Sequence, residues 1–356
     1  MDRINKIIKA IPRVDHSLAA KAQKRLDNLT KPQGSLGRLE ELAKKITAIR
    51  GEENPRLQFK VIFTLAADHG VVEEGVSAYP AEVTAQMLDN FLTGGAAINV
   101  LAKHVGARVV VVDMGVATRV LGARCKVQGF KDKKVCLGTK NMAKGAAMTK
   151  EEAINSLAAG IAVLEEEWPQ GIDIIGTGDM GIGNTTASAA IAACILQRPV
   201  AELTGRGTGI DDVTLAKKIA VIEQALKINQ PNPEDALDVL AKVGGLEIAG
   251  LAGLILAACA RRIPVVIDGF ISGAAALIAA QLEPKVKDYL IAAHCSVEKG
   301  HQAILAYLGL EPLLDLKLRL GEGTGAALGI NLAEAVIKIM TQMATFKTAG
   351  VAEKLK

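Results

Sequence analysis

The stretch GIDIIGTGDMGIGNTTASAA, residues 171–190, joins a short apolar run to a glycine-rich corner and then to an alanine-rich helical pattern. The apolar run is typical of a strand that is covered on both faces. A strand that leads through glycines into a helix is the repeating unit of α/β proteins, in which the strands pair in parallel. The stretch therefore predicts a parallel sheet with helices packed on it.

Five further apolar runs repeat this rhythm along the chain. They are KVIFTLAAD (60–68), ARVVVVDMG (107–115), RIPVVIDG (262–269), KDYLIAAH (287–294) and LLDLKLRLG (313–321). The last run alternates leucines with charged residues, which predicts an edge strand or a strand with one face in water. Residues 81–105 form a long helical pattern between the first two runs. Alternating strands and helices imply right-handed crossovers and an α/β fold with a mostly parallel sheet of about six strands.

The composition limits the class of protein. The chain has 356 residues, of which 50% are hydrophobic, and can bury the core of one large domain with a smaller appendage. Its net charge of +4 and its 3% aromatic content argue against a nucleic-acid partner. The longest apolar run, residues 248–260, is shorter than the roughly 20 residues that span a bilayer, so it predicts a buried helix whose small residues allow close packing. Because the N-terminal residues contain no apolar signal core, we expect a cytoplasmic protein.

The cysteines and histidines do not predict a metal site. The cysteines form no CxxC pair and are expected to be reduced thiols. They are Cys125, Cys136, Cys194, Cys259 and Cys295. His294 and His301 could share a helix face with Cys295, which leaves zinc as a minor alternative. A zinc site normally takes three or four ligands at close spacing, so we expect none here.

Polar residues follow the carboxyl ends of all six expected strands. These corners contain Asp68, His69, Asp113, Asp179, Asp268, His294, Ser296 and Glu322. The carboxyl ends of parallel strands lie along one edge of the sheet, where open α/β folds bind their ligands. Six polar corners therefore predict a binding site at that edge.

The corner after residue 175 carries the spacing of a known nucleotide motif. Gly176-x-Gly178-x-x-Gly181 matches the dinucleotide fingerprint between a strand and a helix, which makes an NAD-dependent oxidoreductase one hypothesis. Against it, the next acidic residue at a strand-like position is Glu202, and the nearby Pro199 interrupts that strand. The same corner also matches an ATP-binding loop, except that asparagine replaces the obligatory lysine.

A phosphate site is the narrower prediction from this corner. Glycines expose backbone N–H groups at a helix N-terminus, where the helix dipole favours an anion. The groups expected there are Gly183, Asn184, Thr185 and Thr186 and, from a second glycine-rich loop and the helix after it, Arg206, Gly207 and Lys218.

A single carboxylate occupies a third glycine-rich corner. The stretch LRLGEGTGAALG, residues 318–329, places Glu322 between two glycines at the end of the last expected strand. Glycines allow positive φ and the close approach of a ligand, so Glu322 would face whatever the loop accepts. A solvent-exposed corner is the alternative for such a turn.

Seven motifs follow one another along the chain. They are KPQGSLGRLE (31–40), AADHGVVEEGVSAYPAEVTAQML (66–88), GTGDMGIGNTTASAA (176–190), GRGTGID (205–211), DGFISGAAAL (268–277), AHCSVEKGH (293–301) and LRLGEGTGAALG (318–329). Together they resemble the nicotinate-nucleotide–dimethylbenzimidazole phosphoribosyltransferase family. The resemblance implies transfer of the 5-phosphoribosyl group from nicotinate mononucleotide to 5,6-dimethylbenzimidazole, giving nicotinate and α-ribazole 5′-phosphate for the lower ligand of cobalamin. It also implies a homodimer without a cofactor or a membrane span.

The same resemblance implies a domain organisation. A large catalytic domain, expected over residues 55–330, would have a Rossmann-like three-layer α/β fold. Residues 1–54 and 331–356 have the composition of helices with a polar face and would form a small helical subdomain.

The resemblance also assigns roles to residues. Glu322 would be the general base, and an ordinary carboxyl pKa of about 4.3 would leave it ionised at neutral pH. The pocket for the aromatic base would be lined by Tyr79, Pro80, Gln86, Met180 and Leu320. The nucleotide would be held by Asp179, Gly181, Asn184, Thr186, Gly207, Lys218 and Ser296, to which the glycine-rich loops add Gly183, Thr185, Arg206 and Gly323. Asp179 departs from the glutamate that the family often has there.

Overall fold

A parallel sheet of six strands forms the centre of the protein. The computed structural model describes residues 1–118, 120 and 129–352, and its strands are β1 (Lys60–Ala67), β2 (Arg108–Gly115), β3 (Phe130–Asp132), β4 (Ile174–Met180), β5 (Val265–Ile267) and β6 (Leu290–Ala292). They pair in the order β3-β2-β1-β4-β5-β6, and each of these pairs is parallel. This is the strand order of a Rossmann-like α/β fold, which confirms the predicted fold class.

The strand expected at residues 313–321 is wrong. The segment meets the sheet edge through an isolated bridge between His294 and Leu314, and Lys317 has a φ of 57°, which is not a strand conformation. Leu316 and Leu320 are more than half exposed, so the alternating leucines do not bury one face. The sixth strand is β3, whose three residues are too few to show a periodic pattern.

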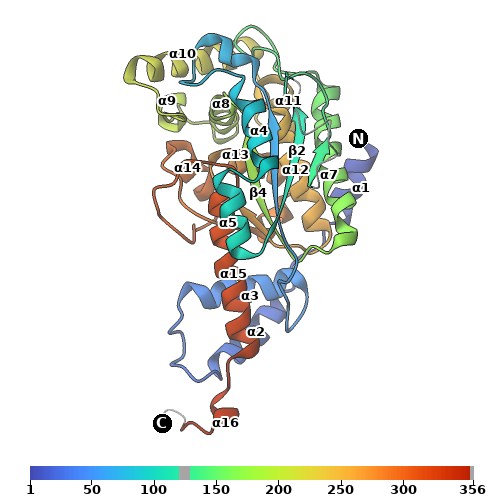
Figure 1. The fold of residues 1–356 in the computed structure, drawn as a ribbon, viewed down its shortest axis with the longest axis vertical. Helices are drawn as coiled ribbons and strands as arrows, with labels where there is room; N and C mark the ends of the chain where they lie inside the picture. Colours follow the sequence, from blue (N-terminus) through green and yellow to red (C-terminus); the bar gives the residue numbers. More distant parts are fainter. Residues whose placement is uncertain (119, 121–128, 353–356) are drawn as a thin grey trace.

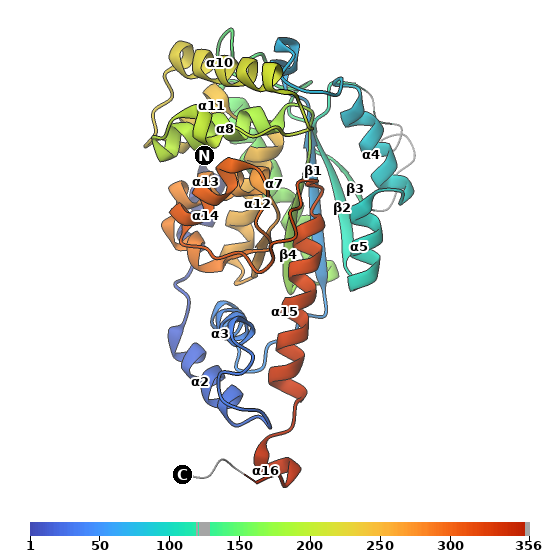
Figure 2. The same cartoon turned by 90° about the vertical axis from the view of Figure 1, so that its left-hand side faces the viewer.

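Helices cover both faces of the sheet, which gives three layers (Figure 2). Alternate residues of β1 point to opposite faces: Val61, Phe63 and Leu65 belong to one hydrophobic cluster, and Ile62 and Ala66 belong to the other. The first face carries α7 (Lys150–Glu167), α8 (Asn184–Leu196), α11 (Ala236–Val243), α12 (Leu246–Ala260) and α13 (Phe270–Leu282). The opposite face carries α4 (Val83–Thr93), α5 (Ala97–Val105) and α15 (Thr324–Gln342).

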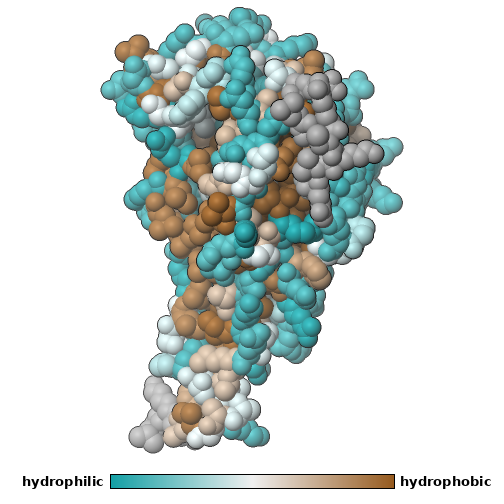
Figure 3. Space-filling model, viewed as in Figure 1, coloured by the Kyte–Doolittle hydropathy of each residue, from teal (hydrophilic) through white to brown (hydrophobic). Residues whose placement is uncertain are grey.

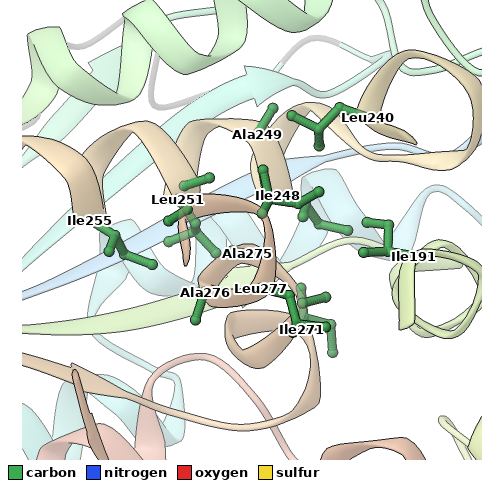
Figure 4. Packing of buried hydrophobic residues seen from close by; sticks show 14 of the residues in the cluster. Ile191, Leu240, Ile248, Ala249, Leu251, Ile255, Ile271, Ala275, Ala276 and Leu277 are labelled. Carbon is green, nitrogen blue, oxygen red and sulfur yellow. The ribbon is translucent and has the colours of Figure 1, made fainter. Parts of the chain in front are cut away.

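The apolar helix predicted around residues 248–260 is α12, and it is buried along almost its whole length. A Cβ on Gly160 of α7 would lie 1.8 Å from the carbonyl oxygen of Gly250 in α12, so the small residues let the two backbones come close. Figure 4 shows Ile248, Leu251 and Ile255 of α12 packed among side chains of α8, α11 and α13. Among the described residues, none of the helices combines the length and hydropathy needed to cross a membrane.

The helical pattern at residues 81–105 forms two helices instead of one. Gly94 ends α4 with a φ of 82°, and α5 starts at Ala97. The α/β body also contains α9 (Val200–Leu203), α10 (Asp212–Asn229), α14 (Lys299–Leu308) and the short 3₁₀ segments Gly70–Glu74, Trp168–Gln170 and Pro284–Tyr289.

A helical lobe projects from one end of the α/β body (Figure 1). It contains α2 (His16–Asp27), α3 (Arg38–Arg50), the C-terminal half of α15 and the short α16 (Phe346–Ala349). α1 (Asp2–Ala10) packs on α7 and α12 of the body. α15 therefore connects the carboxyl edge of the sheet, where it begins, to the lobe.

Candidate active site

A cavity of about 530 Å³ opens at the carboxyl edge of the sheet. Its walls include turns that follow β4, β5 and β6, next to the place between β1 and β4 where the strand order reverses. Ligands bind at this switch point in open α/β folds. The predicted residues that line the cavity are Tyr79, Asp179, Met180, Gly181, Gly183, Asn184, Thr185, Gly207, Ser296 and Leu320.

The predicted phosphate loop lies at the N-terminus of α8. Gly183 is the N-cap of this helix and has a φ of 94°, which favours glycine. The N–H of Ile182 donates to Thr84 Oγ1 at 3.1 Å, and this bond ties the loop to α4. The positive end of the α8 dipole is therefore presented to the cavity, as an anion site requires.

Lys218 of α10 brings a buried cation to the same loop. Its Nζ donates to Thr185 Oγ1 at 2.8 Å and lies close to Gly207, whose N–H donates to Glu298 Oε1 at 2.9 Å. Burial lowers the pKa of Lys218 to about 8, although the charge of Glu298 opposes this shift. A buried ammonium beside a helix N-terminus suits a phosphate group.

The dinucleotide fingerprint is wrong for a geometric reason. Gly176 and Gly178 lie inside β4, not in a turn after it. A Cβ on Gly178 would lie 2.3 Å from the carbonyl oxygen of Glu322, and a Cβ on Gly176 would lie 3.0 Å from the Cβ of Ala326. These two glycines let α15 and the turn before it pack against the strand.

Glu322 lies in that turn with a φ of 64°. It is only 5% exposed, and its Oε2 accepts the N–H of Ile98 at the start of α5 at 3.2 Å. Burial raises the pKa of Glu322, and the charge of Asp268 adds to the shift, while the N–H of Ile98 opposes it. The solvent-exposed corner and the ordinary pKa considered from sequence are both wrong, because the turn is packed between β4 and α5.

Asp179 adjoins the turn of Glu322. Its carbonyl oxygen accepts the N–H of Glu322 at 3.2 Å, and its Oδ2 accepts from Asn184 Nδ2 at 3.0 Å. Burial raises the pKa of Asp179 well above its usual range, and the charges of Asp268 and Glu247 add to the shift. Asp179 therefore ionises less readily than an exposed carboxyl group, because burial and the neighbouring carboxylates disfavour its charged form.

Several predicted site residues lie outside the cavity wall in this arrangement. Arg206 donates to the carbonyl oxygen of Ile210 and to the Asp212 carboxylate, and the N–H of Gly323 donates to Asp268. The others are the buried Thr186 and Lys218, the buried Glu322, and the exposed Pro80 and Gln86.

Sequence reasoning does not identify part of the wall. The missed residues include Ser77, Thr208, Gly269, Phe270, Glu298, Lys317 and Arg319. Arg319 had a usable signal, because it is a cation three positions before Glu322, and it donates to the carbonyl oxygen of Gly207 at 3.0 Å. Glu298 had none, since only the fold brings it to Gly207.

His294 and His301 have other partners than a metal ion. Their ring centroids lie 6.0 Å apart, and Nδ1 of His301 accepts the N–H of Ser296 at 3.0 Å. Burial lowers the pKa of His301 to about 3, and the nearby His294 adds to the shift. Within the part of the chain that the structure describes, which excludes Cys125, no group of three or more His, Cys, Asp or Glu side chains could hold a metal ion.

The fold and the cavity define an α/β protein with a small-molecule cavity at a helix N-terminus, next to a buried lysine and a buried carboxylate. A family model described as phosphoribosyltransferase matches residues 11–351. A nicotinate-nucleotide–dimethylbenzimidazole phosphoribosyltransferase from Chloroflexus aurantiacus is 57% identical over 355 residues and covers 100% of both chains. A protein of the same name from Geobacter metallireducens is 59% identical over 351 residues, which are 99% of this chain and 98% of that protein.

The structural comparison agrees with these relatives. A crystal structure of CobT from Thermus thermophilus matches with a TM-score of 0.90 and 44% identity, over 95% of this chain and 100% of that one. The chain belongs to the nicotinate-nucleotide–dimethylbenzimidazole phosphoribosyltransferase family.

Proposed function

We propose that the protein is a glycosyltransferase that moves the 5-phosphoribosyl group from nicotinate mononucleotide to 5,6-dimethylbenzimidazole, for the lower ligand of cobalamin. The observation that carries the proposal is that the phosphate loop and the buried carboxylate adjoin one cavity. A Cβ on Gly321 would lie 3.1 Å from Asp179 Oδ2, so the turn of Glu322 directly borders the nucleotide loop. The oxidoreductase hypothesis has lost its fingerprint, since Gly176 and Gly178 serve packing.

The donor carries its own activation. Nicotinate mononucleotide has a cationic pyridinium at C1′, so nicotinate leaves with a neutral ring nitrogen, and no pyrophosphate needs to be stabilised. The protein's task is to hold the nucleotide in place. We assign the phosphate to the N-terminal loop of α8, Lys218, Gly207 and Ser296, and the ribose side to Asp179.

The acceptor requires a base. One ring nitrogen of dimethylbenzimidazole attacks C1′ and forms the new C–N bond as the bond to nicotinate breaks, and the N–H of the other ring nitrogen becomes acidic. We assign Glu322 as the group that takes this proton. Its raised pKa makes the ionised carboxylate a stronger proton acceptor than an exposed one. Tyr79, Met180 and Leu320, with Pro80 and Gln86 outside the cavity wall, would enclose the flat ring.

A homodimer is part of the proposal. Tyr79, Leu316 and Leu320 are more than half exposed at and near the cavity, and a monomer leaves these large apolar side chains in water. Figure 3 shows hydrophobic residues gathered along one flank of the body and on the helical lobe. Light scattering should give the mass of two chains, and a monomer at assay concentration would contradict the dimer. We likewise retain residues 55–330 as the catalytic domain, with 1–54 and 331–356 as its helical subdomain, except that α1 packs on α7 and α12 of the body.

The deciding experiment is incubation with both substrates. Nicotinate and α-ribazole 5′-phosphate should appear in equal amounts, measured by chromatography, and NAD alone should bind weakly. Competition between dimethylbenzimidazole, adenine and a phenol at equal concentration then identifies the preferred base. No release of nicotinate, or release without ribosylated base, would overturn the proposal.

A further inference from the structure

Asp268 is a buried carboxylate directly behind the turn that carries Glu322. It follows β5 and is completely buried, while the next residues, Gly269 and Phe270, line the cavity. Its Oδ2 accepts the N–H of Gly323 at 3.2 Å, and its Oδ1 accepts the N–H of Ala326 at 3.1 Å. A single side chain from another strand thus binds the backbone immediately after Glu322 and the first turn of α15.

The turn needs such support because of its backbone conformation. Gly321, Glu322 and Gly323 all have positive φ, at 81°, 64° and 98°. Glutamate is unfavourable in this region and persists there only when its surroundings impose the conformation. Neutral bonds also support the backbone of Glu322: Thr64 Oγ1 donates to its carbonyl oxygen at 2.9 Å, and its N–H donates to the carbonyl oxygen of Asp179 at 3.2 Å.

His294 completes the arrangement around Asp268. Its Nε2 lies 3.6 Å from Asp268 Oδ1. Burial acts to lower the pKa of His294, but its contact with Asp268 and the charge of that carboxylate outweigh burial and leave the pKa raised. Gly325 fits this pair closely, because a Cβ there would lie 2.0 Å from His294 Cδ2 and 2.7 Å from Asp268 Oδ1. The first turn of α15 is therefore shaped to rest on Asp268 and His294.

We propose that Asp268 is a positioning residue for the phosphoribosyl transfer, which holds the turn of Glu322 through Gly323 and Ala326. This inference rests on the proposed function of Glu322. Asp268 does not itself contact the substrates; it acts on the orientation and the basicity of Glu322.

Two consequences separate this role from a merely structural one. The turn that Asp268 holds must place the carboxylate of Glu322 at the reacting nitrogen. Removing the Asp268 carboxylate should therefore lower kcat more than it changes KM for the nucleotide. The charge also affects Glu322 directly, because burial and then Asp268 raise the pKa of its carboxyl. The other titratable groups facing this cluster are Asp179 of β4, Glu247 of α12 and His294 after β6.

The test is Asp268→Asn, which keeps the shape, removes the charge and leaves one oxygen in place of the two that accept the N–H groups of Gly323 and Ala326. The variant should lose about 10²-fold in kcat, the usual cost of a misplacement near 1 Å, with KM for nicotinate mononucleotide within about twofold of wild type. In the pH profile of kcat for this variant, the acid limb should move to lower pH. The matched control is Asp173→Asn, since Asp173 also accepts two backbone N–H groups, those of Gln58 and Phe59 at 2.8 and 2.9 Å, but lies just before β4, at the opposite edge of the sheet from the cavity. Its kcat and its acid limb should stay at wild-type values.

Gly325→Ala tests the same contact without changing any charge. Gly325→Ala should lower kcat while the acid limb of the pH profile stays in place. This variant is the test to use if Asp268→Asn does not fold. Normal kcat in either folded variant, or a raised KM with normal kcat, would overturn the inference. Should the wild type release no nicotinate, the proposed function fails, and the hold on the turn is then tested by hydrogen exchange. The amides of Gly323 and Ala326 must exchange faster in Asp268→Asn than in Asp173→Asn, and equal rates would overturn it.

Discussion

Glu322→Gln removes the proposed proton acceptor and keeps the volume of the side chain. Loss of a general base typically costs 10²–10⁴ in rate, so kcat should fall by roughly this factor, or about 2.7–5.4 kcal/mol of transition-state stabilisation. Binding of nicotinate mononucleotide should change little, because the phosphate loop and Lys218 hold the donor. In the wild type, kcat should decrease as the pH falls through the raised pKa of Glu322, since only the carboxylate accepts the proton.

The fold of this variant should survive. The amide oxygen of glutamine can accept the N–H of Ile98 that Glu322 Oε2 accepts at 3.2 Å. A carboxyl whose pKa is raised by folding contributes most stability below its unfolded pKa, and that contribution is lost as the pH rises through the folded pKa. At neutral pH the wild type therefore carries a destabilising charge that glutamine lacks. The variant should unfold at an equal or higher temperature than the wild type at pH 7, and this advantage should disappear in acid.

The assay is kcat at saturating dimethylbenzimidazole, with the dissociation constant of nicotinate mononucleotide from calorimetry. Glu334→Gln is the matched control, because Glu334 lies on the same helix and pairs with Lys60 at 2.5 Å and Lys338 at 2.7 Å, far along α15 from the cavity. Near-normal kcat in folded Glu322→Gln would refute the assignment of the base. A fall in kcat that Glu334→Gln shares would assign the effect to the helix.

Three further outcomes are expected. Nicotinamide riboside should be a far poorer donor than nicotinamide mononucleotide, because the N–H groups of the phosphate loop would stay unpaired, and comparable turnover would remove the phosphate assignment. Lys218→Met should raise KM for nicotinate mononucleotide about 10–10²-fold with little change in kcat, and wild-type kcat/KM should fall above a pH of about 8, where Lys218 loses its charge. Gly178→Ala should lower kcat, because its Cβ would lie 2.3 Å from the carbonyl oxygen of Glu322, whereas Gly145→Ala, with no atom within 4 Å of the added Cβ, should behave as wild type in a steady-state assay.

The fold could be predicted from the sequence wherever burial leaves a pattern. β1 and β4 are covered on both faces, so their residues are mostly apolar, and the small residues of α12 indicate that this helix packs closely against its neighbours. The prediction of a strand at residues 313–321 is wrong because alternating leucines also occur in an extended loop. Nothing in a single segment states whether a strand is available beside it for pairing, and that information belongs to the tertiary fold.

The loops that form the site could be predicted from the sequence, but the pKa values of its side chains could not. Glycine corners and the single carboxylate Glu322 are local features that a sequence displays. The environment of Glu322 is not local, since the N–H of Ile98 comes from α5 and the charge of Asp268 comes from the residue after β5. The pKa of Glu322 therefore follows from residues that lie far from it in the sequence.

The glycines of β4 explain how donor and acceptor sites come to share one cavity. Their spacing imitates a dinucleotide motif, yet Gly178 leaves the room in which the backbone of Glu322 lies against the strand. The strand then continues through Asp179 to the phosphate loop. The turn that carries Glu322 therefore lies beside β4, and the loop proposed to hold the nucleotide donor lies at the end of β4. A larger residue at Gly178 would separate the two while leaving each intact. Glycine at this position therefore serves the reaction through the distance between donor and base, and this predicts that Gly178→Ala slows the transfer without weakening nucleotide binding.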